Sequence, residues 1–576
     1  MEVVIYKNLI ALPTINCNMR KSKFIFATIM FSFIGIHAHS QNYLWAKSAA
    51  GTNNDYGFSI TADAGGNVYV TGFFASSAIT FGTTTLNNLG GGDLFVVKYN
   101  SSGNVLWARS SGGTFADYGR GIAVDSKGFV YVTGEYNSAS ITFENTKLTN
   151  ISSSGENDFF VVKYDSNGKV IWAKTAGGKN GDETAGIALD GKGNSYITGK
   201  YNSPVLTVGT TTVTTDSITG NASDIFISKL DTLGSAIWTK SAKGLKYDYS
   251  TSIAVDAAGN SYITGSYYST TLSFGTTVIS NSGNNKDTAD IFVAKYDSDG
   301  KLIWAKSAGG ASDDFSNSIA VDGNGNSYLT GSFMSPVIKF GTIDIAGKGN
   351  HDMFVVKYDG NGIAQWAKTS GGGVADYGRS IAADAKGNTI VTGEFNSSSL
   401  SFGTTTITNV GNYDFYFVQY DPLGMVLEAK GAAGGINAEY GRGVAVDPNG
   451  NIYLTGSFKS TSLIFGNNTL TNTNNLADVF VVKYGNVTGI KENTSGNHDF
   501  VFPNRSNGLF TIFSPPYFDV GPTSIEIVNL LGEKVYAKTQ PFSPMITIDL
   551  MDQKKGVYFI RIFCESKSSV QKIIIE

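Results

Sequence analysis

The sequence predicts an all-β protein built from a repeated unit, on three observations. The first is composition. Glycine makes up 69 of 576 residues, well above its usual share of about 7%. Charged residues make up only 16%, against a usual share of about 25%. The second is local pattern: short runs rich in Val, Ile, Tyr, Phe and Thr alternate with Gly/Asn turns, as in short strands joined by hairpins. The third is a sequence repeat at nearly equal intervals along most of the chain.

The repeat has three anchors. One is Thr-Gly at the end of a strand-like run, with its glycine at Gly72, Gly134, Gly199, Gly265, Gly331, Gly393 and Gly456. The second is Asp-x-Phe-Val-Val-Lys-Tyr or a close variant, which begins at Asp93, Asp158, Asp224, Asp290, Asp352, Asp414 and Asp478. The third is Trp-Ala-Lys or a close variant, at Trp45, Trp107, Trp172, Trp238, Trp304 and Trp366, with Glu428 in the seventh place.

Each repeat predicts four short antiparallel strands, so seven repeats predict a seven-bladed β-propeller over residues 41–485. The two ends support a closed ring. Residues 43–48 contain the Trp-Ala-Lys strand without a preceding partner, and residues 480–484 contain the partner strand without a following Trp-Ala-Lys. We expect these two segments to pair and complete the last blade. A β-solenoid is the alternative, and it would not need the split hairpin.

The N-terminal residues 1–40 have the pattern of a secretory signal peptide. A basic start at residues 19–23 precedes an apolar run over residues 24–36, which is too short to span a membrane. Small residues before Gln41 predict cleavage after Ser40, and Met19 fits as the true start. We therefore expect no transmembrane segment in the mature chain; a buried N-terminal helix is the alternative.

The repeat also resembles a known family. Asp-x-x-Gly-Asn-x-Tyr-x-Thr-Gly, Asp-x-Phe-Val-x-Lys-Tyr and Trp-Ala-Lys together are similar to the SBBP repeats of bacterial β-propellers, over residues 43–484. The resemblance implies a propeller in an exported or surface protein. It implies no particular activity.

Unequal connections suggest which face of the propeller carries function. The turns after the first strand and before Trp-Ala-Lys are tight, and the other two connections are predicted to be long, including one from Gly331 to Asp352 with a second hairpin signature. Both long connections would lie on one face, here called the long-loop face, where binding residues are expected.

A carboxylate precedes each first strand there, at Asp55, Asp117, Asp182, Asp248, Asp314, Asp376 and Glu439. A cation or sugar site is one interpretation of this ring, and turn capping is the one that its sevenfold regularity favours.

Three repeats depart from this regularity by carrying an arginine. The motif is Asp/Glu-Tyr-Gly-Arg, and its residues are Asp117, Tyr118 and Arg120, Asp376, Tyr377 and Arg379, and Glu439, Tyr440 and Arg442. These nine residues are the candidate binding site, because Arg, Tyr and a carboxylate together suit an acidic glycan or a peptide carboxylate. Ion pairs that only join blades are the structural alternative.

After a polar linker at residues 486–498, residues 499–576 predict a small Ig-like β-sandwich of short alternating strands. The order of motifs, with Phe502-Pro503-Asn504, Gly556-Val557-Tyr558 and a terminal Lys-Ile block, resembles the C-terminal sorting domain of cargo of the Bacteroidetes type IX secretion system. Arg505 replaces a usual proline. The resemblance implies the type IX machinery as a partner, with localisation outside the cell or on its outer-membrane surface. A fibronectin-like adhesion module is the alternative.

The scarce residues limit the chemistry. Two cysteines and four histidines leave no disulfide framework and no zinc cluster once residues 1–40 are removed, so we assign no metal, no cofactor and no catalytic residue. A net charge of −4 without basic blocks argues against nucleic acid. The sequence favours a secreted or surface binding or adhesion protein with a glycan or protein ligand. Alternatives are a polysaccharide lyase or hydrolase that uses carboxylate, Tyr and Arg groups, and a passive coat protein.

Overall fold

The structure is a computed structural model, and it describes residues 41–152, 155–215, 222–283, 287–432, 434–486, 501–503, 505–513, 523–529, 533–540, 545–564 and 567–576. The described residues form strands and turns, with no helix among them. The predicted signal peptide lies outside them, as does most of the predicted linker. The all-β prediction is confirmed.

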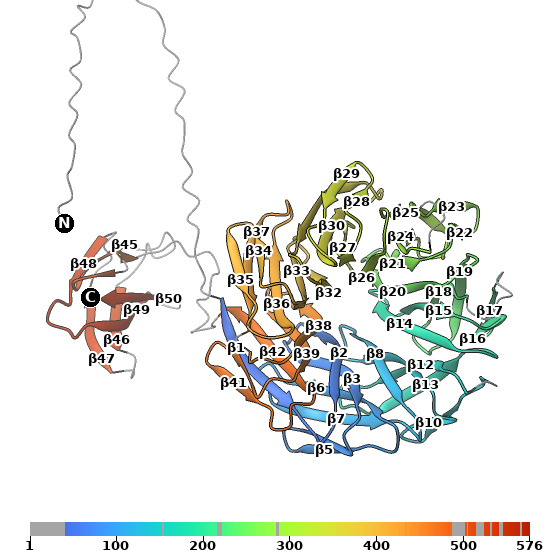
Figure 1. Cartoon of the computed structure of the whole chain (residues 1–576). Helices are drawn as coiled ribbons and strands as arrows, with labels where there is room; N and C mark the ends of the chain where they lie inside the picture. Colours follow the sequence, from blue (N-terminus) through green and yellow to red (C-terminus); the bar gives the residue numbers. More distant parts are fainter. Residues whose placement is uncertain are drawn as a thin grey trace, which may run out of the picture. The chain divides into compact units, whose positions relative to one another are not determined.

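The described part of residues 41–486 folds into seven four-stranded antiparallel sheets, the blades, arranged in a ring (Figure 1). The first strands lie nearest the ring centre and are β2 (Asp55–Ala62), β8 (Asp117–Val124), β14 (Asp182–Leu189), β20 (Asp248–Val255), β26 (Asp314–Val321), β32 (Asp376–Ala383) and β38 (Glu439–Val446). The second strands are β3 (Val68–Phe74), β9 (Val130–Tyr136), β15 (Ser195–Tyr201), β21 (Ser261–Tyr267), β27 (Ser327–Phe333), β33 (Thr389–Phe395) and β39 (Ile452–Phe458).

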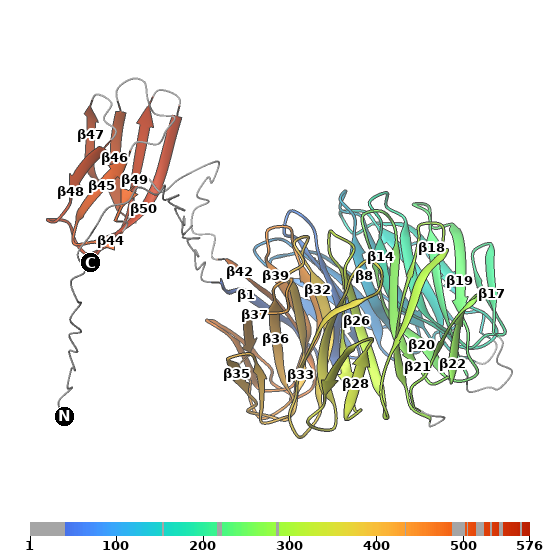
Figure 2. The same ribbon diagram turned by 90° about the horizontal axis from the view of Figure 1, so that it is seen from above.

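The outer half of each blade follows the same order. The third strands are β6 (Asp93–Tyr99), β12 (Asp158–Tyr164), β18 (Asp224–Leu230), β24 (Asp290–Tyr296), β30 (Asp352–Tyr358), β36 (Asp414–Tyr420) and β42 (Asp478–Asn486). The fourth strands are β7 (Val105–Ser111), β13 (Val170–Ala176), β19 (Ala236–Ala242), β25 (Leu302–Ala308), β31 (Ala364–Ser370), β37 (Val426–Gly431) and β1 (Gln41–Ala49). Blades are numbered 1 to 7 by their first strands, so β1 belongs to blade 7. Figure 2 shows the ring edge-on, with the strands running across its thickness.

The ring is closed by the pairing that the two chain ends predict. β1 pairs antiparallel with β42, from Gln41 opposite Asn486 to Ala49 opposite Val479. Each first strand also contacts the first strand of the next blade, and β38 contacts β2. Blade 7 therefore takes three strands from the end of the propeller segment and one from its beginning, and the predicted closure is confirmed.

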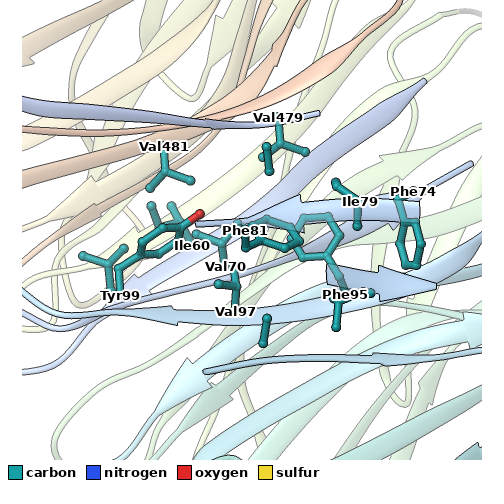
Figure 3. Close-up of a cluster of buried hydrophobic side chains, with 14 of the residues drawn as sticks. Ile60, Val70, Phe74, Ile79, Phe81, Phe95, Val97, Tyr99, Val479 and Val481 are labelled. Atoms are coloured by element: carbon teal, nitrogen blue, oxygen red, sulfur yellow. The ribbon is translucent and has the colours of Figure 1, made fainter. Parts of the chain in front are cut away.

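Hydrophobic packing between blades continues across the closure. Figure 3 shows Val479 and Val481 of β42 beside Ile60 and Val70 of blade 1, in one cluster of buried side chains. Each fully buried Val, Ile or Phe of this kind contributes roughly 1.5–3 kcal/mol relative to exposure. The third strands are buried along both faces, as in β6 and β12, because each is packed between two neighbouring blades.

The Thr-Gly anchor is also explained by close packing. A Cβ on Gly72 would collide with the carbonyl oxygen of Tyr56 and the ring of Phe95. Glycine is therefore required where the first strand bends over the second. Its equivalents meet the same obstacle, since a Cβ on Gly331 would collide with the carbonyl oxygen of Phe315.

A small hairpin lies between the second and third strands of every blade. The hairpins are β4 (Ala78–Phe81) and β5 (Thr84–Asn87), β10 (Ser140–Phe143) and β11 (Thr146–Thr149), β16 (Val205–Val208) and β17 (Thr211–Thr214), β22 (Thr271–Phe274) and β23 (Thr277–Ser280), β28 (Val337–Phe340) and β29 (Ile343–Ala346), β34 (Ser399–Phe402) and β35 (Thr405–Thr408), and β40 (Ser462–Phe465) and β41 (Asn468–Thr471).

These hairpins correct the predicted elaboration of the long-loop face. They lie on the outer side of the ring (Figure 1), where β5 contacts β7 and Thr80 bridges to Ala50. The apolar residues of each hairpin, such as Ile79 and Phe81, are buried and hold it there. The connection from a fourth strand to the next first strand is also short, as at residues 112–116. The long-loop face is thus less elaborated than expected.

A tryptophan clamp joins neighbouring blades. In six interfaces the tryptophan of one fourth strand donates from Nε1 to a backbone carbonyl in the turn of the next blade, at 3.0 to 3.2 Å. The lysine of the adjacent third strand donates to the same carbonyl; Lys229 and Trp238 both reach Ser298 O. The tryptophan ring covers a turn glycine such as Gly300, whose φ of 78° suits glycine and whose Cβ would collide with Trp238.

The interface between blades 6 and 7 lacks this clamp for a physical reason. The turn that would supply the carbonyl does not exist in blade 7, because β42 and β1 are not consecutive in the chain. Glu428 replaces the tryptophan and Gln419 replaces the lysine. Tyr484 donates from its hydroxyl to Glu428 Oε2 at 2.5 Å, and Tyr43 packs on the ring of Tyr484 at 5.1 Å.

The described part of residues 501–576 forms two sheets with one shared hydrophobic core, which confirms the predicted β-sandwich. One sheet has the order β43 (Val501–Phe502), β45 (Leu509–Phe513) and β48 (Met545–Asp549). The other has the order β44 (Arg505–Ser506), β50 (Lys567–Ile575), β49 (Gly556–Cys564), β46 (Thr523–Asn529) and β47 (Lys534–Gln540). Arg505, the departure from the motif, lies 3.2 Å from Glu576 in an exposed ion pair.

Candidate ligand-binding site at the mouth of the channel

The second residue of each first strand lies at the start of the strand, on the long-loop face around the central channel. We call these seven positions the collar: Tyr56, Tyr118, Glu183, Tyr249, Phe315, Tyr377 and Tyr440. Six of the seven are aromatic, and all seven are partly exposed. Aromatic rings that remain partly exposed in a repeated position are available for stacking with a ligand.

A β-bulge follows each collar residue. In β8 the register passes from Gly119 to Gly121, so Arg120 has no partner on β9. The bulged positions of the seven blades are Phe58, Arg120, Ala185, Thr251, Asn317, Arg379 and Arg442. Tyr118 and Arg120 lie on the same face of the strand because side chains alternate with a period of two, and the guanidinium of Arg120 lies 4.5 Å from the ring of Tyr118.

The three candidate carboxylates lie in the interior rather than on the surface. Asp117 is fully buried, where Oδ2 accepts a hydrogen bond from Ser138 Oγ at 2.8 Å and Oδ1 accepts one from Ser138 N at 3.2 Å. Asp376 makes the same bonds with Ser397, and Glu439 is equally buried. These residues cap the turn after the second strand, and we leave them out of the binding surface.

Each capping carboxylate also faces a second buried carboxylate, the leading Asp of the third strand in the preceding blade. Burial raises the pKa of Asp117 to about 6, and burial together with the charge of Asp117 raises the pKa of Asp93 to about 6. At the closure, burial and then the charge of Asp55 raise the pKa of Asp478 to about 7. A pair of buried like charges favours the protonated form of at least one member.

Arg120, in blade 2, is fully engaged within the fold. Its Nε donates to Glu135 Oε1 at 3.0 Å, and Glu135 stands opposite Tyr118 on the neighbouring strand. Its guanidinium also lies 5.1 Å from the ring of Phe58, which comes from blade 1. Arg120 and Tyr118 thus lie together, and the carboxylate that pairs with the arginine is Glu135 and not Asp117.

The other two arginines share one carboxylate. Arg379 donates from Nε to Glu394 Oε1 at 2.6 Å and stacks on Tyr377 at 4.1 Å. Arg442 stacks on Tyr440 at 5.0 Å and reaches the same Glu394 oxygen only at 3.9 Å. The structure thus brings the Arg-Tyr pairs of blades 6 and 7 into one cluster. The Arg-Tyr pair of blade 2 lies elsewhere on the collar.

Sequence analysis missed several side chains of this cluster. His351 lies 5.0 Å from the ring of Tyr377, Tyr413 lies 6.3 Å from Tyr377, and Tyr413 lies 5.9 Å from Tyr440. His351 and Tyr413 each immediately precede a third strand, so their proximity to the collar comes from the fold. Burial and then the charge of Arg379 lower the pKa of His351. The aromatic residue one place after each capping carboxylate was the available sequence signal for the collar.

A cavity of about 200 Å³ lies at the centre of the ring. It is lined by alternating serine and apolar residues of the first strands, such as Ser59 and Ile60 of blade 1 and Ser252 and Ile253 of blade 4. Arg120 also lines it, whereas Arg379 and Arg442 do not. The cavity therefore offers hydroxyl groups next to the aromatic collar.

Comparison with known proteins agrees with this class of fold. Residues 106–140, 303–332 and 433–457 match the SBBP beta-propeller repeat model. Residues 500–576 match the secretion system C-terminal sorting domain. The chain therefore combines SBBP β-propeller repeats with a C-terminal sorting domain of the type IX secretion system, which indicates handling by that machinery and export from the cell or to its surface.

Two curated relatives share sequence with the chain. An uncharacterized WD repeat-containing protein of Acanthamoeba polyphaga mimivirus is 26% identical over 74% of this chain and 36% of its own length. The regulatory protein FlaEY of Caulobacter vibrioides is 32% identical over 28% of this chain and 17% of its own length. The chain thus spans about a third or less of the length of either relative.

Solved structures are similar at low identity. The Pan2 WD40 domain of Neurospora crassa has a TM-score of 0.38 at 10% identity, covering 78% of this chain and 98% of that one. A polysaccharide lyase of family PL25, an ulvan lyase, has a TM-score of 0.36 at 11% identity, covering 74% and 98%. Within the described residues, no helix is long and apolar enough to cross a membrane.

Proposed function

We propose that the protein is an exported binding protein whose collar holds a glycan outside the cell or on its surface. In this proposal residues 1–40 act as the signal peptide for the first membrane, and the sorting domain directs passage across the outer membrane. The propeller is then the cargo. Its ligand is met outside the cytoplasm, where polysaccharides are abundant.

The observation that carries this proposal is the collar itself. Six partly exposed aromatic rings surround one opening, and polar groups such as Arg442 lie between them. Binding sites for small ligands combine apolar and aromatic walls with a few placed polar groups. A sugar ring offers an apolar C–H face for stacking and hydroxyls for hydrogen bonds, so it matches this composition. The original candidates Tyr118, Tyr377, Tyr440, Arg120, Arg379 and Arg442 belong to the collar or to its bulges.

A binding role is favoured over a hydrolytic one by the position of the carboxylates. Glycoside hydrolysis requires a pair of carboxyl groups that reach the glycosidic bond. Asp117, Asp376 and Glu439 are buried under the turns that they cap. Glu135 and Glu394 are held in ion pairs with arginines and are also buried.

The test is a glycan array probed with the full chain from Gln41 onward, followed by calorimetry on the best ligand. The double variant Tyr377→Ala/Tyr440→Ala should weaken binding roughly tenfold or more, because it removes two stacking surfaces. Leu106→Ala is the matched control, since Leu106 is exposed on the outer strand β7. Equal affinity for the collar variant and the control would contradict a collar site, and no binding to any glycan would contradict the proposed function.

A second candidate function is polysaccharide cleavage by β-elimination, and one observation favours it. His351, Tyr377 and Arg379 form a contiguous group, and they offer an imidazole as general base, a phenol as general acid and a guanidinium for the uronate carboxylate. Incubation of the protein with uronate polysaccharides would then release unsaturated products that absorb ultraviolet light. The absence of such products across a broad panel would sink this candidate and leave the binding role in place.

A further inference from the structure

The three arginine-bearing blades differ at the position opposite the collar residue. In blade 2 Tyr118 stands opposite Glu135, and in blade 6 Tyr377 stands opposite Glu394. In blade 7 Tyr440 stands opposite Ser457. Opposite residues on neighbouring antiparallel strands project from the same face of the sheet, so blades 2 and 6 provide their own carboxylate for the arginine and blade 7 does not.

The consequence for Arg442 is incomplete pairing. Among the described residues, Arg442 Nε and Ser457 Oγ are buried atoms without a hydrogen-bond partner, and so is Glu394 Oε2. Ser457 itself is fully buried. The closest carboxylate oxygen to Arg442 lies at 3.9 Å and is already bonded to Arg379. Buried polar groups normally find partners, so the three unpartnered atoms gathered here leave hydrogen-bonding capacity unused at this interface.

Exposure alone does not separate Arg442 from Arg120. The two side chains are 32% and 34% exposed. Arg120 pairs with its own Glu135 and packs against two rings, Phe58 and Tyr118. Arg442 packs against one ring and shares a carboxylate. Two guanidiniums facing one carboxylate leave an uncompensated positive charge between blades 6 and 7.

Other ionisable groups lie around this cluster. Asp376 and Asp414 are buried, and burial raises the pKa of both. The Oδ1 of Asp313 is engaged with the backbone, where it accepts a hydrogen bond from Ala289 N at 2.8 Å. Burial and then the charge of Arg379 lower the pKa of His351. Within the described part of the chain, no ion pair joins any of these groups to Arg442, whose one carboxylate contact there is Glu394.

We infer that the collar between blades 6 and 7 binds the anionic group of an acidic saccharide, a uronate carboxylate or a sulfate, with Arg442 as the group that recognises it. This inference rests on the proposed glycan-binding function. His351, Tyr377, Tyr413 and Tyr440 form a continuous aromatic row beside the two guanidiniums. A sugar ring stacked on that row would present a charged substituent to Arg442, and guanidinium binds carboxylate and sulfate with two parallel hydrogen bonds. The aromatic row favours a saccharide over an acidic peptide.

The test compares four polymers on the full chain from Gln41 onward by calorimetry: polygalacturonate, its neutral methyl ester, dextran sulfate and poly-glutamate. Wild-type protein should bind polygalacturonate or dextran sulfate more tightly than the methyl ester, with affinity that falls as salt rises. Arg442→Gln should weaken binding of the acidic polymer roughly tenfold to hundredfold, as expected for charged hydrogen bonds. Arg109→Gln is the matched control, because Arg109 lies on the outer strand β7 away from the collar, and it should change the affinity by less than about threefold.

A second variant tests the inference without removing the arginine. Ser457→Glu places in blade 7 the residue that blades 2 and 6 already hold at this register. The new carboxylate should pair with Arg442 and abolish the preference for the acidic polymer, while affinity for the methyl ester is unchanged. Circular dichroism of each variant checks folding.

Several results would overturn the inference. Equal binding of polygalacturonate and its methyl ester would remove the anionic preference and leave the glycan-binding function intact. Unchanged acidic-polymer affinity in both Arg442→Gln and Ser457→Glu would exclude this site. Binding of poly-glutamate alone would assign the cluster to an acidic peptide, and binding of no saccharide would overturn the proposed function as well.

Discussion

Six of the seven blade interfaces are joined by a tryptophan clamp, whereas the interface between blades 6 and 7 is joined without one. At a regular interface, Trp238 and Lys229 donate to the same turn carbonyl of Ser298. At the interface between blades 6 and 7, Glu428 accepts a hydrogen bond from Tyr484. The ring of Tyr43 packs against Phe417 of blade 6 and Tyr484 of blade 7. The difference teaches that the sequence of a repeat follows its tertiary surroundings: where the accepting turn is missing, both donors of the clamp are replaced.

The largest expected effect comes from removing the closing strand. Deletion of residues 41–49 takes β1 from blade 7, exposes the edge of β42 and opens the ring. We expect loss of cooperative unfolding of the propeller, measured by calorimetry and denaturant titration. Truncation of residues 487–576 is the control and should leave the propeller transition near its original midpoint. A deletion variant with the original midpoint would refute closure by β1.

The next largest effect is the difference in stability loss between a variant at a clamped interface and a variant at the interface between blades 6 and 7. Trp238→Ala removes a side chain that is only 8% exposed, together with its hydrogen bond to Ser298 O. It should lower the free energy of unfolding by about 3–5 kcal/mol. Glu428→Ala removes the hydrogen bond from Tyr484 and a partly exposed ion pair with Lys430, and should cost about 1–2 kcal/mol. Denaturant titration of both variants measures the difference, and a larger loss for Glu428→Ala would reverse the comparison.

The buried carboxylate pairs predict that the propeller loses stability as pH rises. Burial raises the pKa of Asp93 to about 6 and that of Asp182 and Asp478 to about 7, against about 3.9 in an unfolded chain. Between these values the folded state binds more protons than the unfolded state, so the free energy of unfolding decreases with pH. The stabilisation is complete below about pH 4 and is lost as pH passes through 6 to 7.

Thermal unfolding at pH 5 and pH 8 measures this effect, and the midpoint should be higher at pH 5. Asp478→Asn should reduce the difference, because it removes one titrating group while keeping the size of the side chain. The change should be modest, since one pair of seven is altered. A higher midpoint at pH 8 than at pH 5 would contradict the predicted direction.

The smallest expected effect comes from introducing the missing tryptophan at the interface between blades 6 and 7. Glu428→Trp restores the repeat motif, yet blade 7 has no turn carbonyl to accept the indole N–H. We expect no gain in stability and a loss of about 1 kcal/mol from the broken bond to Tyr484. Denaturant titration measures the change, and stabilisation by this variant would show that another acceptor lies within reach of the introduced indole.

The fold was largely predictable from the sequence, and the candidate site only in part. The Thr-Gly, Asp-x-Phe-Val and Trp-Ala-Lys anchors predict the four-strand blade, because strand alternation and tight turns are local properties. The position of the β4–β5 hairpin was predicted wrongly. Loop length in the sequence does not reveal that Ile79 and Phe81 pack against the outer side of the ring.

At the site, residue types were predicted and their roles were not. Asp117 and Arg120 are near neighbours in the sequence, yet Asp117 is buried and the partner of Arg120 is Glu135. Positions three apart on a strand point to opposite faces of the sheet, so Asp117 faces the interior and Arg120 the collar. His351 and Tyr413 carried no local signal at all. His351 meets Tyr377 only because blades 5 and 6 are side by side, and Tyr413 meets Tyr377 only because β32 and β36 belong to one blade.

The sequence by itself determined the repeat, its four strands, the pairing of its two ends and the presence of a sorting domain, since each depends on short motifs or on hydrophobic alternation. Only the tertiary structure decided why Glu428 breaks the motif and which arginine has an incomplete set of partners. Both depend on contacts between neighbouring blades, where residues about sixty positions apart meet in every repeat. The residue pattern of one strand does not show which hydrogen-bond partner is missing in the neighbouring blade.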